Sequence, residues 1–103
     1  MPRPRKRRTC RAHSGDRVFK PRSAPMGRLE TVRLELSELE AMRLCDLEGL
    51  NQTRSGERMG ISRGTVQRLL KSGRLKVVKT LLDSHALVIE EGGDHEDLFS
   101  EET

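Results

Sequence analysis

The chain has 103 residues, of which 35% are charged and 33% hydrophobic, and it contains no Trp or Tyr. This length and composition support one small aliphatic core with tails, and exclude a large multidomain protein. The longest uninterrupted apolar run, residues 86–89, is too short for a membrane span or a signal-peptide core, so we expect a cytoplasmic protein without membrane association. Cys10 and Cys45 form no disulfide framework, which fits a reducing compartment.

Charge is segregated along the chain, although the net charge is only +4. Residues 1–28 carry ten Lys or Arg and one acid, and residues 51–80 carry eight and one. Residues 29–50 carry two Lys or Arg and six acids, and residues 81–103 carry eight acids and no Lys or Arg. The two basic segments predict a polyanionic partner such as nucleic acid. The alternative is an ordinary solvated helix face.

Residues 1–28 are predicted to be a flexible basic arm that precedes a folded domain at 29–90. Pro2 and Pro4 disfavour a helix, and the like charges repel one another. The cations that open this arm are candidates for phosphate contacts: Arg3, Arg5, Lys6, Arg7 and Arg8. Residues 91–103 are predicted to be a mobile acidic tail.

The first half of the domain is predicted to be a strand followed by a helix. Residues 31–36 alternate polar and apolar side chains, which indicates a short strand. Ser37 and Glu40 match a capping box, which predicts a helix that continues to Leu47 and ends at Gly49. Residues 86–90 are a second strand candidate. We expect it to pair with residues 31–35, because an isolated strand cannot satisfy its own backbone.

Residues 52–71 carry the most informative pattern of the chain. Asn51 can cap a helix that runs to about Met59, and Gly60 can end that helix in the left-handed conformation. Ser62 can cap a third helix that continues to about Leu82. Gly56 lies midway along the first of these two helices, where a small residue allows close approach. This is the spacing of a helix-turn-helix, whose second helix can enter the DNA major groove; the alternative is a purely structural helical hairpin.

The pattern also predicts which side of the third helix is buried. Apolar residues at helical spacing predict its packing face: Val66, Leu69, Leu70, Val77 and Leu81. Met59 and Ile61 are predicted to join them where the two helices cross. Gly73 falls on the same face, so it either permits close packing or weakens the helix there.

Polar side chains on the opposite side are candidates for DNA contact. Arg63 and Arg68 can fork to guanine, and Gln67 can bond to adenine. The start of the preceding helix can hold a phosphate, which fixes register without reading sequence. The complete candidate set for DNA binding is Gln52, Thr53, Ser62, Arg63, Thr65, Gln67, Arg68 and Lys71, with Gly60 as the turn residue. For each residue the alternative is a solvated polar side chain.

From Ser37 to Leu82 the chain resembles region 4 of the primary sigma-factor family. The matching stretches are Leu-Glu-Gly-Leu at 47–50, Met-Gly-Ile-Ser-Arg-Gly-Thr-Val at 59–66, and the basic helix after them. The wider pattern resembles a family of small, uncharacterised prokaryotic predicted DNA-binding proteins, the domain of unknown function one-three-four. That resemblance rests on residues 1–10, 19–21, 40–50 and 86–93.

The resemblance implies a fold and a function. The implied fold is mainly α, a three-helix helix-turn-helix domain of the sigma region 4 or winged-helix type with two short paired strands. The implied function is sequence-specific binding of double-stranded DNA, and we expect a transcriptional regulator. Gly64 departs from the family pattern by removing a side chain that a base-reading helix would use.

Two other functions stay open at this point, and so does the formation of a homodimer. The basic arm suits an RNA- or ribosome-binding adaptor, and a sigma-like fold suits a module that contacts RNA polymerase. A homodimer is compatible with the pattern, since one helix-turn-helix covers little DNA.

Enzymatic and metal chemistry find little support in the sequence. Cys10 and His13 form a Cys-x-x-His pair, but His85 and His95 are too far apart to supply the second close pair of a zinc site. The chain has no Ser/His/Asp arrangement, no phosphate-binding glycine loop and no convincing pair of carboxylates. We therefore expect a non-enzyme with no metal and no cofactor.

Overall fold

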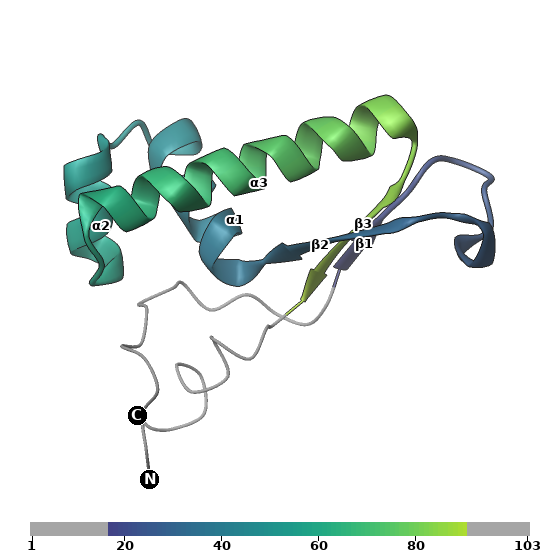
Figure 1. The fold of residues 1–103 in the computed structure, drawn as a ribbon, viewed down its shortest axis with the longest axis horizontal. Helices are drawn as coiled ribbons and strands as arrows, with labels where there is room; N and C mark the ends of the chain where they lie inside the picture. Colours follow the sequence, from purple (N-terminus) through teal and green to yellow (C-terminus); the bar gives the residue numbers. More distant parts are fainter. Residues whose placement is uncertain (1–16, 91–103) are drawn as a thin grey trace, which may run out of the picture.

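Over the residues that the structure describes, the protein is mainly helical, with three α-helices and a small sheet, as the sequence predicted (Figure 1). The structure, a computed structural model, describes residues 17–90. In chain order the elements are β1 (Arg17–Phe19), the 3-10 turn η1 (Met26–Arg28), β2 (Thr31–Glu35), α1 (Leu36–Met42), the π-helical turn η2 (Arg43–Leu47), α2 (Gln52–Met59), α3 (Arg63–Asp83) and β3 (Ala86–Glu90).

The sheet has three strands in the order β1-β3-β2, with the last strand of the chain in the centre. The predicted pairing of residues 31–35 with 86–90 is confirmed. It is parallel, with Thr31 opposite Ala86 and Leu34 opposite Ile89. This orientation follows from the connection, because α1, α2 and α3 all lie between the two strands and return the chain to the same end of the sheet.

Strand β1 was not predicted, because residues 17–19 were assigned to the flexible arm. The strand pairs antiparallel with β3, and Arg17 lies opposite Ile89. All three of its residues are exposed, so no alternation of buried and exposed side chains marks it in the sequence. Backbone hydrogen bonds to the open edge of β3 define this strand, and they depend on a partner 70 residues away.

The start of α1 differs from the predicted capping box. The cap is Glu35 rather than Ser37, and its backbone N–H donates to Oε1 of Glu38 at 2.9 Å. Leu36 and Ser37 are instead buried inside the first turn. Tertiary packing sets this start, because Leu36 joins Leu34 and Ile89 in a small cluster between the sheet and the helix.

The helix predicted to reach Leu47 does so, but its last turn is wider than an α-helix. The Glu48 N–H donates to the Arg43 carbonyl at 2.9 Å, five residues back, which is the π-helical pattern. Gly49 has a φ of +81°, a left-handed conformation that ends the helix as predicted. Asn51 then caps α2, and its side chain accepts from the Arg54 N–H at 2.8 Å.

The main core lies where α1, α2 and α3 meet. Its buried side chains come from all three helices and η2: Ala41, Leu44, Met59, Val66, Leu69 and Leu70. Of the residues predicted to be buried at the helix crossing, Ile61 is only half buried and packs at the edge of this core. The three helices are thus held as one unit, and α3 extends beyond it over the sheet (Figure 1).

Gly73 permits close packing, the first of its two predicted alternatives. A Cβ at this position would lie 2.6 Å from Sδ of Met42 and 3.3 Å from Cβ of Glu38, so α1 and α3 approach through the glycine. The predicted apolar face fails further along α3, because Leu81 is exposed. Thr80 is buried there instead, and its hydroxyl donates to the Lys76 carbonyl at 2.8 Å.

Candidate nucleic-acid interface

The helix-turn-helix geometry is built by one turn residue and one cap. Gly60 ends α2 with φ +72° and ψ +32°, the left-handed conformation predicted for it. The next N–H, of Ile61, donates back to the Gly56 carbonyl at 2.9 Å. Ser62 then caps α3, because its Oγ accepts from the Thr65 N–H at 3.1 Å. The turn from α2 into α3 therefore lies where the sequence predicted it.

Gly56 leaves room for the backbone of that turn. A Cβ on Gly56 would lie 2.6 Å from the Ile61 carbonyl oxygen, which is closer than real side chains come. The position needs a small residue, as predicted, but the neighbour is the turn just before α3 rather than the body of α3. Any larger residue would push the two helices apart.

The predicted contact residues lie together around α2 and the first half of α3. Thr53, Ser62, Arg63, Gln67, Arg68 and Lys71 are exposed, whereas Gln52 and Thr65 are half buried. Nη1 of Arg63 lies 3.5 Å from Oε1 of Gln52, so the two helix starts are adjacent.

Two hydroxyls of the predicted set already have bonds within the fold. The Ser62 and Thr65 hydroxyl oxygens lie 3.0 Å apart, and Nη2 of Arg68 donates to Oγ1 of Thr65 at 3.1 Å. Ser62 and Thr65 therefore organise the start of α3, and Thr65 also orients the Arg68 guanidinium.

Ion pairing separates the cations of residues 51–80 into two groups, a division that the sequence does not reveal. Four of the eight pair with acids: Arg54 with Glu57, Arg74 with Asp46, Lys76 with Glu38, and Lys79 with Asp83. Within residues 17–90 the other four have no acidic partner: Arg58, Arg63, Arg68 and Lys71. Three of them were predicted contact residues, and Arg58 on α2 is an addition.

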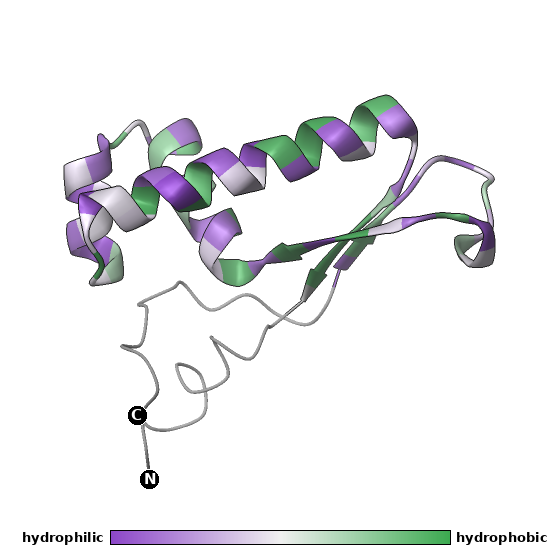
Figure 2. Ribbon diagram, viewed as in Figure 1, coloured by the Kyte–Doolittle hydropathy of each residue, from purple (hydrophilic) through white to green (hydrophobic). Residues whose placement is uncertain are grey.

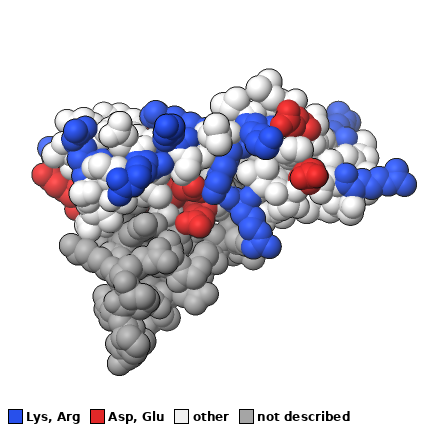
Figure 3. Space-filling model, in the orientation of Figure 1, with Lys and Arg blue, Asp and Glu red and all other residues white. Residues whose placement is uncertain are grey.

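The unpaired cations belong to the end of the molecule formed by α2 and the start of α3. Lys and Arg side chains outnumber acidic ones over this end in the space-filling view (Figure 3). The paired cations Arg74, Lys76 and Lys79 all come from the second half of α3. Net positive potential is therefore concentrated around the first half of α3, which an anionic ligand would favour.

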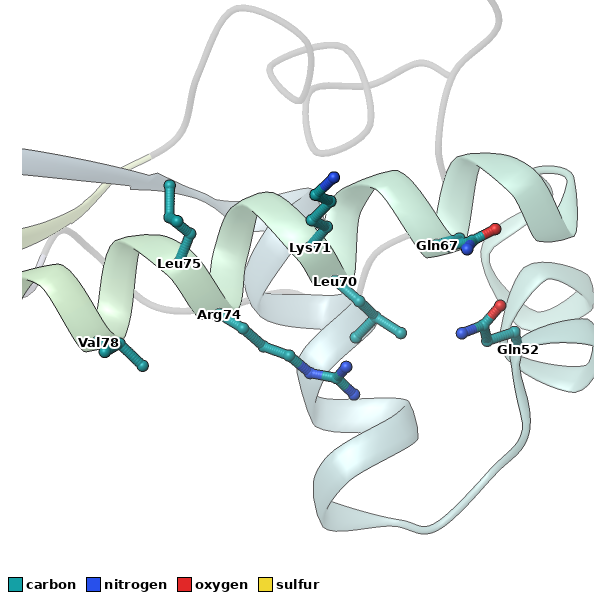
Figure 4. Close-up of a pocket in the computed structure, with 7 residues that line it drawn as sticks. All are labelled: Gln52, Gln67, Leu70, Lys71, Arg74, Leu75 and Val78. Carbon is teal, nitrogen blue, oxygen red and sulfur yellow. The ribbon is translucent and has the colours of Figure 1, made fainter.

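A shallow hollow of about 590 Å³ lies along the exposed side of α3. It runs from Gln52 and Gln67, whose side chains lie near each other in the close-up, to Leu75 and Val78 (Figure 4). Arg74 forms part of its wall and donates to Asp46 through Nη2 at 2.6 Å and Nε at 3.2 Å. These bonds, together with the charge of Asp46, raise the pKa of Arg74 above its ordinary value.

Several predictions lie outside the described residues. The arm cations at positions 3–8, the Cys10 and His13 pair, and His95 all precede residue 17 or follow residue 90. Within residues 17–90, no group of three or more His, Cys, Asp or Glu gathers as a metal site would require. In the same part of the chain, no helix is both long and apolar enough to cross a membrane.

Sequence comparison identifies relatives across most of the chain. A UPF0251 protein of Vibrio parahaemolyticus is 46% identical over 88 residues, which cover 85% of this chain and 92% of the relative. A UPF0251 protein of Rhodospirillum rubrum is 44% identical over 92 residues, 89% of this chain and 64% of the relative. A UPF0251 protein of Desulforudis audaxviator is 50% identical over 78 residues, which cover 76% of this chain and 50% of the relative. The matched part of the chain therefore spans only half of that relative.

No solved structure resembles the protein closely enough to count as a match. The model of one protein family matches residues 1–98, which is nearly the whole chain. The relatives named above carry the name UPF0251, and the chain belongs to the family described as protein of unknown function DUF134.

Proposed function

We propose that the protein binds double-stranded DNA through α2 and α3 and regulates transcription. The observation that supports this most is the concentration of unpaired cations on a helix-turn-helix. Arg63, Arg68 and Lys71 lie on the exposed side of α3, beside Gln67, and no acid of residues 17–90 neutralises them. The other cations of α3 are ion-paired within the fold. The three unpaired ones present the positive charge and the hydrogen-bond donors that a DNA groove attracts.

The proposed roles differ along α3. Arg63 and Gln67 lie in its first two turns, the part of a recognition helix that reaches base edges. Arg68, oriented by Thr65, can donate to a guanine or a phosphate. Lys71, one turn further along, is placed for the phosphate backbone.

The start of α2 supplies a second proposed phosphate contact. Asn51 uses its side chain to cap the Arg54 N–H, which leaves other N–H groups of the first turn open. Gln52 and Thr53 lie at this end of α2, and the helix dipole favours an anion there. Such a contact would fix the orientation of α3 in the groove without reading sequence.

A binding comparison tests whether the protein prefers duplex DNA or RNA. The full chain is titrated, at about 0.15 M salt, against duplex genomic fragments and against structured RNA of matched length. We expect tighter binding to duplex DNA and enrichment of a defined sequence on repeated selection. A preference for RNA would instead support the adaptor alternative carried by the basic arm.

A matched pair of substitutions separates base reading from phosphate contact. Gln67→Ala should weaken binding to the selected site by about 1–3 kcal/mol and change binding to random DNA little, because it removes a base contact. Arg68→Ala should behave in the same way if its guanidinium reads guanine.

Lys71→Ala is the control for that pair. It should weaken binding to the selected and the random DNA equally. It should also reduce the slope of log affinity against log salt concentration by about 0.9, as expected for the loss of one phosphate contact. Equal losses for Gln67→Ala on the selected and random DNAs would show that Gln67 does not read a base.

Regulation of transcription is tested separately from binding. In a purified transcription reaction in which the template carries the selected site, adding the protein should change transcript yield, and scrambling the site should remove the change. Retention of RNA polymerase by the protein in the absence of DNA would favour the sigma-like alternative.

A further inference from the structure

Four cations of α2 and the first half of α3 are both unpaired and exposed. Arg58, Arg63, Arg68 and Lys71 have no acidic partner among residues 17–90, and no described residue buries them. Along α3, hydrophilic and apolar residues alternate in the hydropathy view (Figure 2), as in a helix that is packed on one side and exposed on the other. Like charges held together on one surface repel one another, so this surface favours an anionic ligand.

The sequence that follows β3 has the opposite charge. Residues 91–103 carry six acids and no Lys or Arg. We call residues 91–103 the acidic segment. Its acids are Glu91, Asp94, Glu96, Asp97, Glu101 and Glu102. The chain therefore contains, next to its folded domain, a segment whose charge is complementary to that of the unpaired cations.

The acidic segment begins close to the middle of α3. The parallel register of β2 and β3 places Glu90 opposite Glu35. The Glu35 N–H donates to Oε1 of Glu38 at 2.9 Å, and Oε2 of Glu38 accepts from Oγ of Ser72 at 2.6 Å. Residue 91 therefore follows a strand end that adjoins the contact between α1 and α3.

The acidic segment is long enough to reach the unpaired cations from that point. An extended chain spans about 3.3 Å per residue, so 13 residues reach about 43 Å. Arg63 lies nine residues before Ser72, which is about 14 Å along the axis of α3, and Lys71 is the neighbour of Ser72. The exposed cations Arg22 and Arg28 are less accessible from residue 91, because they precede β2 at the opposite end of the sheet.

We propose that the acidic segment binds Arg63, Arg68 and Lys71 of its own chain, so that DNA must displace it. This inference rests on the proposed function, because it gives that site a competitor built into the chain. The helix holds these cations in place, so the contact restricts one chain segment, whereas pairing with the basic arm would restrict two. The covalent link gives the segment a high effective concentration, although each exposed ion pair is weak.

The first test maps the contact without DNA. In a full chain that carries Cys10→Ser and Cys45→Ser, Ser100→Cys receives a nitroxide spin label, which broadens the amide signals of nearby residues. Signals of residues 63–71 should broaden at about 50 mM salt and recover at about 1 M, because salt screens exposed charges. The control is the same labelled chain with the six acids replaced by the corresponding amides, and its signals over residues 63–71 should remain sharp.

The same labelled chain shows which surface and which copy the acidic segment contacts. Broadening confined to residues 1–28, or no broadening of residues 63–71 at low salt, would overturn the proposal. A mixture of spin-labelled chain and isotope-labelled chain without the spin label reports contacts between copies. Broadening of residues 63–71 as strong in this mixture as within one chain would overturn a contact within the chain.

The second test measures the competition with DNA. A segment that covers the site for nine-tenths of the time raises the apparent Kd about tenfold. The variant with six amides should therefore bind duplex DNA about tenfold more tightly at about 50 mM salt, and the gain should shrink at about 200 mM. The control carries Leu98→Ser and Phe99→Ser, which change the segment without changing its charge, and it should bind like the parent.

Removal of residues 1–8 distinguishes the two basic surfaces in the DNA assay. The gain from the six amides should persist without these residues, because the acidic segment contacts α3. Loss of the gain would show that the segment covers the basic arm instead, and would overturn the proposal.

The two tests also separate this inference from the proposed function. Broadening of residues 63–71 without any binding to duplex DNA would overturn the proposed function and leave the contact established. Duplex DNA binding by the parent that the six amides do not strengthen would overturn the competitor alone.

Discussion

Single residues define the helix-turn-helix more than its apolar pattern does. Asn51, Gly60 and Ser62 fix one helix start, one helix end and the next helix start within twelve residues. Each acts through its own backbone or side-chain hydrogen bonds, so each is recognisable in the sequence. Ser84 shows the limit of such recognition. It ends α3 in the same left-handed conformation with φ +56°, although a serine in the sequence does not predict that conformation.

Gly60→Val should destabilise the domain by about 1–3 kcal/mol and weaken DNA binding with it. The native φ of +72° is strained for a β-branched residue, and small domains have only about 5–15 kcal/mol of total stability. Thermal unfolding and DNA binding of the same variant provide the measurement. Gly60→Asn is the control, because asparagine tolerates the left-handed conformation and should retain most of the stability. A Val variant that melts like the parent would contradict the role given to Gly60.

At the scale of elements, the packing of α1 on α3 positions the proposed recognition helix. Glu38 is the centre of this contact. Its carboxylate accepts from Ser72 Oγ at 2.6 Å and from Lys76 Nζ at 2.8 Å, both on α3. It also caps the start of α1 through the Glu35 N–H, so one buried side chain joins the end of β2, the start of α1 and the middle of α3.

Glu38→Ala should lower the free energy of unfolding by roughly 1–3 kcal/mol, because it leaves three donors without their buried acceptor. Urea unfolding monitored by circular dichroism measures the loss. Glu57→Ala is the control: Glu57 is exposed and pairs with Arg54 at 3.4 Å, and such a pair contributes about 0–1 kcal/mol. Equal effects of the two substitutions would show that the Glu38 contacts do not hold α1 and α3 together.

At the scale of the whole molecule, two segments of the sequence carry most of the positive charge, and the proposed function assigns both of them to one polyanion. Residues 1–28 carry a net charge of +9 (ten minus one), and residues 51–80 carry +7 (eight minus one). Four cations of the second segment are paired inside the fold, and residues 1–28 hold the larger net charge of the two segments. If the protein binds DNA as proposed, long-range attraction to DNA depends on the arm as well as on α3.

Deleting residues 1–8 should leave the melting temperature unchanged but lower DNA affinity and flatten its salt dependence. The segment carries five Lys or Arg, and each phosphate that a cation neutralises steepens the salt slope by about 0.9 on duplex DNA. Binding is measured between about 50 and 200 mM salt. Deletion of residues 96–103, an equal length without Lys or Arg, is the control and should not lower affinity. An unchanged slope after removal of residues 1–8 would mean that the arm does not contact the DNA backbone.

Local chemistry explains which features the sequence predicted correctly. The turn at Gly60, the caps at Asn51 and Ser62 and the end at Gly49 each depend on residues within about four positions, and all four were confirmed. The start of α1 was misplaced by two residues because packing of Leu36, rather than the Ser37 hydroxyl, decides it. The predicted burial of Leu81 was wrong for a similar reason. Helical spacing predicts which face of α3 is apolar, but it does not predict how far along α3 the neighbouring elements cover that face.

The sequence alone determined the family, the mainly helical class and the register of the helix-turn-helix, because these follow from composition and from interactions close in the chain. The tertiary structure alone decided that β1 joins the sheet, that β2 and β3 run parallel, and that Arg58, Arg63, Arg68 and Lys71 are left unpaired within residues 17–90. It also decided that Leu75, Val78 and Leu82 are left uncovered. These features depend on partners up to about 70 residues away, such as Asp46 for Arg74 and Ile89 for Arg17, and no local pattern records such distances.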